Sequence, residues 1–265
     1  MASRTKQKEE ARARRLAEER AHTERVRRER RLRMIGGVVL AAVAVVAVLI
    51  AVSSGGTSKA TGLQKGTGQA KTVAGVSSLL SGIPQSGARL GNPKAPVTMT
   101  YFGDLECPIC QEFTLSGGFP QLVANEVRTG KVQVVYKAFE TATRVPSVFQ
   151  TQQVAALAAG QQNLFWDFAE LFYHEQGQEG SGYVTESYLQ GLAKQVPGLN
   201  FVKWESSRNQ SALASQVISD EHAGSSLGVT GTPTLVFQGP TGKTASPPEG
   251  VPTYADLQQA IKQVS

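Results

Sequence analysis

The pattern of apolar and polar positions predicts a mixed α/β body over residues 91–265. Two β-rich runs, VTMTYF at 97–102 and KVQVVYKAF at 131–139, are separated by a helical stretch that is interrupted near Gly117. This order predicts a β-α-β unit. A third strand, in GTPTLVFQG at 231–239, is followed by a short strand and a closing amphipathic helix. The body therefore belongs to the α/β class.

A block of helical patterns lies between the second and third strands. Apolar residues recur at helical spacing in PSVFQTQQVAALAAGQQ and again in NLFWDFAELFYHEQ. Thr185 is a suitable N-cap for a further helix. We predict a helical insertion over about 142–212, and we assign Trp166 and Trp204 to core packing rather than to a binding site.

The longest apolar run lies near the N-terminus. Residues 34–52, MIGGVVLAAVAVVAVLIAV, include no charged side chain. A helix of this length would span about 28 Å, which is close to the hydrocarbon thickness of a bilayer. We predict an uncleaved transmembrane helix that contacts the lipid bilayer, with a cleavable signal peptide as the alternative. In both cases the body lies outside the cytoplasm.

Charge is concentrated before this run. Residues 1–33 hold 13 of the 27 Lys and Arg residues, which places the N-terminus in the cytoplasm by the positive-inside rule. The rest of the chain is nearly neutral, so we expect no nucleic-acid binding. Residues 53–90 begin with a Gly, Ser and Thr-rich stretch, and we predict a flexible linker between the membrane and the body.

The chain contains two cysteines, Cys107 and Cys110, at the turn between the first predicted strand and its helix. A structural zinc site needs four ligands, and neither His174 nor His222 has ligand spacing, so we predict no metal and assign both histidines to the helix surface or to caps. A bridge across two intervening residues closes too small a loop to add much stability. A redox centre is the preferred interpretation.

The neighbours of this pair indicate how one thiol is activated. Pro108 suits the first position of a helix, which makes Cys107 the N-cap at the positive end of the helix dipole. That position stabilises a thiolate, so Cys107 is predicted to be the exposed nucleophile and Cys110 the less exposed resolving thiol. Asp104 and Glu106 could tune this thiol or accept a proton, and the alternative is that both are solvated loop acids.

A second motif, GVTGTPT at 228–234, lies directly before the third strand. A proline at this place suits a cis X-Pro turn, and an ordinary trans proline is the alternative for the motif alone. Together with TYFGDLECPIC at 100–110 and AALAAGQQNLFWDFAELFYHEQ at 155–176, it resembles the DsbA-type thioredoxin-fold thiol–disulfide oxidoreductases. The similarity is greatest to the membrane-anchored kind found in Gram-positive bacteria, and it covers most of 91–265.

This resemblance implies a thioredoxin fold with a helical insertion and a site in which Pro233 is a cis-proline beside the cysteines. The backbone of Thr232 would pair with an extended substrate chain. The resemblance also implies no cofactor beyond the Cys107–Cys110 disulfide, reduced secreted proteins as substrates, and a quinone-linked membrane oxidase as the recycling partner. We expect a monomer, because a covalent dimer would consume an active thiol.

One residue departs from the family pattern. The best-known strongly oxidising members have His after the Pro of this motif, whereas this chain has Ile109. Ile109 cannot donate a hydrogen bond or a positive charge to Cys107, and one unit of thiolate pKa corresponds to about 30 mV in the potential of this couple. An oxidase is therefore the first hypothesis, and a reductase or isomerase, or a non-catalytic binding module, are the alternatives.

Overall fold

The computed structural model describes residues 63–265. The basic tail predicted at 1–33 and the transmembrane helix predicted at 34–52 lie outside these residues, as does the start of the predicted linker. Among the helices of the described part, none combines the length and the apolar character needed to cross a bilayer.

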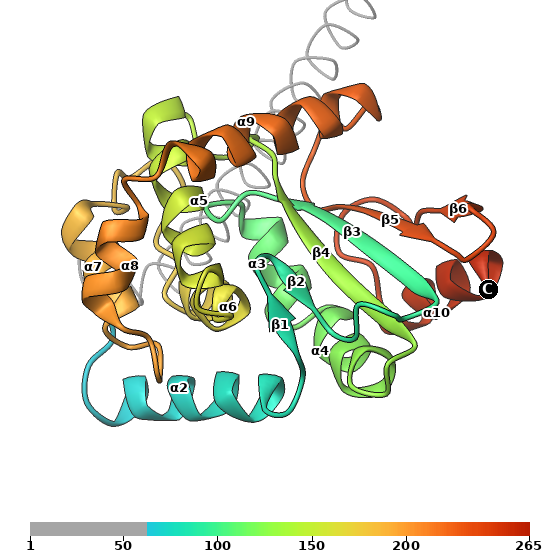
Figure 1. Ribbon diagram of the computed structural model, residues 1–265, viewed down its shortest axis with the longest axis horizontal. Coiled ribbons are helices and arrows are strands. Elements are labelled where there is room, and N and C mark those ends of the chain that lie inside the picture. Colours follow the sequence, from blue (N-terminus) through green and yellow to red (C-terminus); the bar gives the residue numbers. More distant parts are fainter. Residues whose placement is uncertain (1–62) are drawn as a thin grey trace, which may run out of the picture. The chain divides into compact units, whose positions relative to one another are not determined.

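A six-stranded mixed sheet lies at the centre of the fold, with the strand order β1-β2-β4-β3-β5-β6 (Figure 1). The central strand β3 (Val97–Gly103) pairs in parallel with β4 (Val132–Ala138) and antiparallel with β5 (Thr234–Gln238). These are the three main strands that the sequence predicts. The short strands β1 (Gln85–Ser86), β2 (Arg89–Leu90) and β6 (Thr244–Ala245) extend the sheet in antiparallel pairs.

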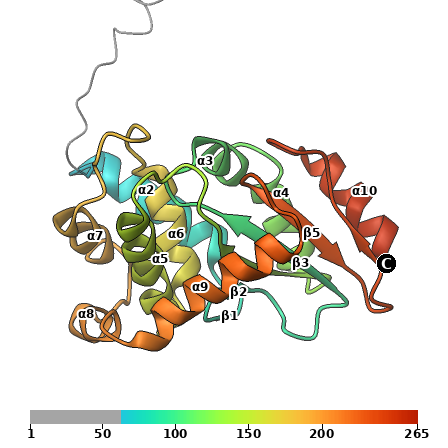
Figure 2. The same ribbon diagram turned by 90° about the horizontal axis from the view of Figure 1, so that it is seen from above.

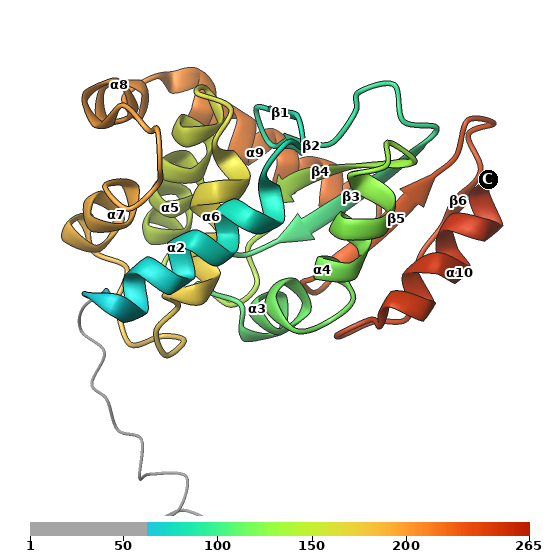
Figure 3. The same cartoon turned by 90° about the horizontal axis from the view of Figure 1, so that it is seen from below.

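Helices cover both faces of this sheet. One face is covered by α9 (Ser211–Ser226), as Figure 2 shows from above. The other face is covered by α3 (Pro108–Leu115), α4 (Phe119–Leu122) and α10 (Tyr254–Val264), which Figure 3 shows from below. The π-helical turn η2 (Val123–Val127) continues α4. The break between α3 and α4 falls at Gly118, where a Cβ would lie 2.7 Å from the backbone of Thr253.

The predicted helical insertion is a group of helices beside the sheet (Figure 1). Its members are α5 (Pro146–Gly160), α6 (Phe165–His174), α7 (Glu186–Ala193) and α8 (Phe201–Ser207). Trp166 and Trp204 are buried in the core as predicted, and each indole donates a hydrogen bond to a backbone carbonyl, at 3.1 and 2.8 Å. The Thr185 hydroxyl accepts from the N–H of Tyr188, so Thr185 is the predicted N-cap of α7.

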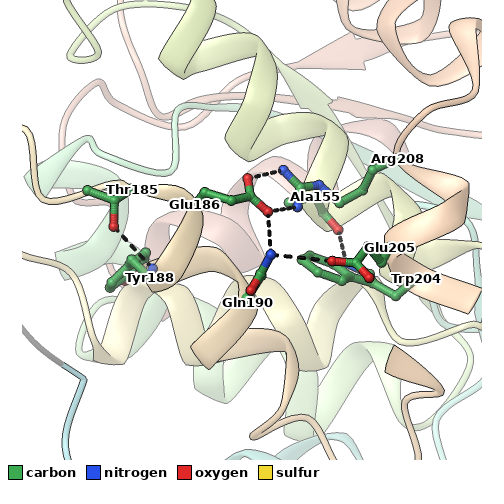
Figure 4. A network of polar contacts seen from close by, with 8 residues as sticks. All are labelled: Ala155, Thr185, Glu186, Tyr188, Gln190, Trp204, Glu205 and Arg208. Atoms are coloured by element: carbon green, nitrogen blue, oxygen red, sulfur yellow. Dashed lines mark hydrogen bonds and ion pairs between the residues drawn. The ribbon is translucent and has the colours of Figure 1, made fainter. Parts of the chain in front are cut away.

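A polar network joins α7 to α8 and the residue that follows it (Figure 4). The two terminal nitrogens of Arg208 lie 2.5 and 2.7 Å from the two carboxylate oxygens of Glu186. The guanidinium carbon of Arg208 also lies 4.7 Å from the ring centroid of Trp204. Hydrogen bonding to Arg208 lowers the pKa of Glu186. Gln190 bridges Glu186 to Glu205, so the two short helices are tied together at their surface.

The prediction of a flexible linker over 53–90 is wrong for its second part. Residues Thr67–Leu80 form helix α2, whose Val76 and Leu80 are buried against the body. Arg128 donates hydrogen bonds to two carbonyl groups at the C-terminal end of this helix. The Gly, Thr and Lys residues that suggested a linker occupy mostly exposed or half-buried positions, while a few apolar residues at helical spacing make the contacts. The folded body therefore begins before residue 91.

Candidate active site

Cys107 occupies the N-cap of α3, as the sequence predicts. Its backbone is extended (φ −72°, ψ 119°), and Pro108 takes the first helical position, where its missing N–H costs no hydrogen bond. The backbone N–H of Cys110 points back to the Cys107 sulfur at 3.4 Å. The sulfur thus lies where the first turn of the helix presents its free N–H groups.

This environment lowers the pKa of the Cys107 thiol to about 6. The largest cause is the hydrogen bond from the Cys110 side chain, which outweighs the opposing effect of burial. The Thr232 side chain and the backbone N–H groups of Cys110 and Ile109 lower it further. A thiol with a pKa of about 6 is roughly nine-tenths ionised at neutral pH, so Cys107 is a thiolate in the reduced protein.

Cys110 has the opposite character. It is fully buried, and burial, followed by the proximity of Cys107, raises the pKa of its thiol well above the ordinary value. The hydroxyl group of Tyr101 donates to the Cys110 carbonyl at 3.4 Å and lies 3.1 Å from the hydroxyl of Thr114. Aromatic packing therefore closes the inner side of the cysteine pair. The two thiols differ in proton affinity, as an attacking and a resolving thiol require.

The GVTGTPT motif is brought directly against Cys107. The peptide bond between Thr232 and Pro233 is cis, in agreement with the prediction. The Cys107 sulfur lies 3.3 Å from the Thr232 carbonyl oxygen, although the two residues are 125 positions apart in sequence. The strand β5 begins at the next residue, Thr234, so the loop is fixed by the sheet.

The prediction that Cys107 is exposed needs correction. Only 5% of its surface is accessible, because the sulfur packs between the first turn of α3 and the Thr232 carbonyl. Its neighbour Ile109 is 41% exposed and contributes to a groove of about 370 Å³. Leu227, Val229, Thr232, Pro233 and Val236 also line this groove. Thr232, whose carbonyl oxygen lies 3.3 Å from the Cys107 sulfur, connects this partly apolar groove to the reacting atom.

Asp104 and Glu106 are not the solvated loop acids that the sequence left as an alternative. Asp104 is fully buried, and its carboxylate accepts hydrogen bonds from the loop 141–143. Glu106 is 5% exposed, and burial raises the pKa of its carboxyl group. Both acids are thus part of the packed structure around the cysteine loop.

The structure also brings residues to the site that the sequence does not single out. Gln176 follows α6, and its amide donates to the carbonyl groups of Leu105 and Cys107 at 2.7 and 3.2 Å. In return, the amide of Gln111 on α3 donates to the Tyr173 carbonyl at 2.6 Å. We call these contacts the glutamine clamp. The only sequence signal for it is the position of Gln176 within the motif at 155–176.

His174 and His222 are exposed on α6 and α9 as predicted, and the described residues hold no cluster of His, Cys, Asp and Glu that could bind a metal ion.

Comparisons with known proteins agree with this geometry. The chain matches the thioredoxin family model over residues 85–263. It is 28% identical to disulfide bond formation protein D of Bacillus subtilis over 151 residues, which cover 55% of this chain and 65% of that protein. It is 26% identical to the probable disulfide bond formation protein D of Bacillus anthracis over 157 residues, which cover 57% and 69%. The match thus spans slightly less than two thirds of the Bacillus subtilis protein.

Solved structures show the same fold. Oxidised BdbD from Bacillus subtilis superposes with a TM-score of 0.56 at 24% identity, over 69% of this chain and 96% of that chain. DsbA2 from Pseudomonas aeruginosa superposes with a TM-score of 0.53 at 23% identity, over 69% and 96%. The chain therefore belongs to the thioredoxin family, and the predicted resemblance to the DsbA-type thiol–disulfide oxidoreductases is confirmed.

Proposed function

We propose that this protein is a membrane-anchored, extracytoplasmic thiol–disulfide oxidoreductase that donates a Cys107–Cys110 disulfide to secreted or cell-surface proteins. The observation that carries the proposal is the Cys107 sulfur, held at the N-cap of α3 beside the Thr232 carbonyl with its pKa lowered to about 6. A thiolate of low pKa is a good leaving group, so a disulfide that contains it is readily passed to a substrate.

The transfer proceeds in two exchanges. A substrate thiolate attacks the Cys107 sulfur, the Cys107–Cys110 bond breaks, and Cys110 leaves and takes up a proton because its own pKa is raised. A second substrate thiolate then attacks the substrate sulfur of the mixed disulfide and releases Cys107 as a thiolate. The substrate loses two electrons and forms one disulfide, and the enzyme gains both electrons as a dithiol.

The groove beside the site supports a substrate class of unfolded, reduced chains. Ile109 and Leu227 are 41% and 64% exposed, so they offer apolar surface without a shaped pocket for one side chain. The backbone around Thr232 can pair with an extended chain, and main-chain pairing has little sequence preference. Such a surface suits many different substrates.

The location rests on the sequence. The apolar run at 34–52 and the 13 basic residues before it support a single-pass anchor with a cytoplasmic N-terminus. Disulfides persist outside the cytosol, and the names of the Bacillus relatives are in keeping with disulfide formation. Regeneration of the disulfide then requires an electron acceptor, for which we propose a quinone-linked oxidase in the same membrane. No further cofactor is needed for the exchange, and we propose that the protein acts as a monomer.

Ile109 favours a second candidate, a reductase or isomerase with the same site. Its exposed side chain cannot donate a hydrogen bond to the Cys107 thiolate, which weakens the thermodynamic drive for oxidation. A non-catalytic binding module is the third candidate, and the low pKa of Cys107 argues against it.

A redox titration of the full-length protein in detergent separates these candidates. A donor of disulfides should have a potential between about −200 and −120 mV, and a value near −270 mV, as in thioredoxin, would replace it with the reductase. Trapping thiols by alkylation in cells should find Cys107 mostly oxidised under the first proposal and mostly reduced under the second. Replacement of Cys110 by Ser should accumulate mixed disulfides that identify the substrates, and a variant that traps none would point to the binding module.

A further inference from the structure

The carboxylate of Asp104 is held in an unusually complete set of hydrogen bonds. One of its oxygens, Oδ2, accepts from the three successive backbone N–H groups of residues 141–143, at 3.0, 2.9 and 2.8 Å. The other, Oδ1, accepts from the Thr143 hydroxyl at 2.6 Å and from the N–H of Glu106 at 3.0 Å. Asp104 is fully buried, so these bonds face no competition from water. The conformation of the loop 141–143 therefore depends on this one side chain.

Within residues 63–265, one side-chain hydrogen bond joins that loop to the cis-proline loop. The hydroxyl group of Thr141 makes a short hydrogen bond to the hydroxyl group of Thr232. Thr141 has no other side-chain bond among those of the described residues, and its backbone N–H is one of the three that Asp104 holds. The contact therefore links Asp104 to Thr232 across 128 positions of sequence.

Thr232 is in turn the residue that meets the reacting sulfur. Its carbonyl oxygen lies 3.3 Å from the Cys107 sulfur, and its side chain contributes to the low pKa of that thiol. When Thr141 donates its proton to the Thr232 oxygen, the Thr232 hydroxyl keeps its own proton free for the sulfur. The orientation of the Thr232 hydroxyl would then decide whether it can donate a hydrogen bond to the Cys107 sulfur.

We propose that Asp104 is a positioning residue of the cysteine centre, which holds the loop 141–143 so that Thr141 orients the Thr232 hydroxyl toward the Cys107 sulfur. The inference rests on the proposed function only in treating Cys107 as the reacting sulfur. It assigns Asp104 and Thr141 a role in setting the ionisation and the potential of that sulfur without touching it or the substrate.

A charge effect and a positioning effect of Asp104 have opposite signs. A nearby negative charge disfavours a thiolate, so a purely electrostatic Asp104 would raise the pKa of Cys107, and removal of its charge would lower it. If Asp104 instead positions the loop, its removal releases the loop and weakens the hydrogen bond to the thiolate. The pKa of Cys107 then rises. Asp104→Asn is the variant that tests the sign, since it keeps the size of the side chain and removes the charge and one acceptor oxygen.

The main test uses Thr141, which is exposed and can be replaced without opening the core. Thr141→Val removes the hydroxyl and keeps the N–H that Asp104 holds, whereas Thr141→Ser keeps the hydroxyl. The readout is the ultraviolet absorbance of the Cys107 thiolate against pH in the reduced full-length protein, with the oxidised protein as baseline. The tyrosines closest to the cysteine pair, Tyr101, Tyr136 and Tyr173, have raised pKa values and ionise outside this range.

We expect Thr141→Val to lower the acid dissociation constant of the Cys107 thiol by about threefold to tenfold. Thr141→Ser should have the wild-type value. Asp104→Asn should act in the same direction. In a Thr232→Val background, Thr141→Val should cause no further change, because its effect passes through that hydroxyl. Thr129→Val is the matched control, since Thr129 is also exposed and hydrogen-bonded but precedes β4 at the other end of the sheet.

Three results would overturn the proposal. The first is a Thr141→Val protein that melts at a lower temperature while Cys107 titrates as in the wild type. The second is a double variant in which the effects of Thr141→Val and Thr232→Val on the acid dissociation constant of Cys107 multiply. The third is stronger ionisation of Cys107 in Asp104→Asn. A wild-type protein that fails to exchange disulfides would refute the proposed function instead, and the titrations would still be decisive for Asp104.

Discussion

The sulfur of Cys107 lies 3.3 Å from the carbonyl oxygen of Thr232, and this contact joins two motifs that are 125 residues apart. In the proposed function, the backbone at Thr232 is also the segment that pairs with a substrate chain. A substitution in this loop would then change both the reactivity of the sulfur and the recognition of the peptide.

The hydrogen bond between the two cysteines is the largest cause of the low pKa of Cys107. Replacement of Cys110 by Ala should therefore raise the pKa of Cys107 by about one unit or more. The thiolate absorbance and the rate of reaction with iodoacetamide should both show the shift. An unchanged midpoint near 6 would mean that the helix N-terminus and Thr232 activate the thiol without Cys110.

The reduction potential should depend on pH in two regimes. Below the Cys107 pKa of about 6, reduction takes up two protons, and the potential should fall by about 60 mV per pH unit. Above it, Cys107 stays ionised, so only Cys110 takes up a proton and the slope should be about 30 mV per pH unit. A single slope through pH 6 in a titration against glutathione buffers would contradict the assignment.

The same pKa governs the stability of the reduced protein. The thiol of Cys107 has a lower pKa in the folded protein than the roughly 8.5 of a free thiol, so its contribution is fully present above pH 8.5. It should be lost as the pH falls toward 6, whereas the oxidised protein has no such contribution. Denaturant unfolding of both redox forms between pH 5 and 9, with their difference plotted against pH, measures it.

Ile109 is an exposed position where the potential can be altered without disturbing the core. Replacement of Ile109 by His should stabilise the Cys107 thiolate and raise the potential by tens of millivolts, since one pKa unit corresponds to about 30 mV. Ile109→Leu is the size-matched control and should leave the potential unchanged. Equal potentials for the two variants would show that this position does not face the sulfur.

Arg208 offers a test of the helical insertion that leaves the cysteines untouched. Its paired bond to Glu186 and its stacking on Trp204 should together contribute about 1–2 kcal/mol to the free energy of unfolding. Arg208→Met keeps the length of the side chain and removes the charge, and Lys203→Met, at an exposed position of α8, is a surface control. Chemical denaturation of both variants compares them, and equal stabilities would show that the network contributes little.

Short stretches of sequence predict the elements whose formation depends on neighbouring residues. Cys107 is an N-cap because Pro108 follows it, and the three main strands have clear β-rich runs. The two-residue strands β1 and β2 are too short to show the alternation of apolar and polar residues that predicts a strand. Helix α2 is not predicted because its Gly and Thr residues are typical of a linker. The sequence offers Asp104 as a residue that could tune the thiol, but it does not predict the hydrogen bonds of Asp104, because these partners lie 37 to 39 residues away and are backbone groups.

The glutamine clamp fixes how the helical insertion can move. Gln176 holds the cysteine loop from the insertion, and Gln111 holds the end of α6 from the cysteine helix, so the two bodies are bonded in both directions. A hinge that swung the insertion away from the thiols would have to break all of these amide bonds together. If the protein acts on reduced chains as proposed, these bonds would keep the cysteine loop and the end of α6 together, and the adaptation on binding would fall to the substrate.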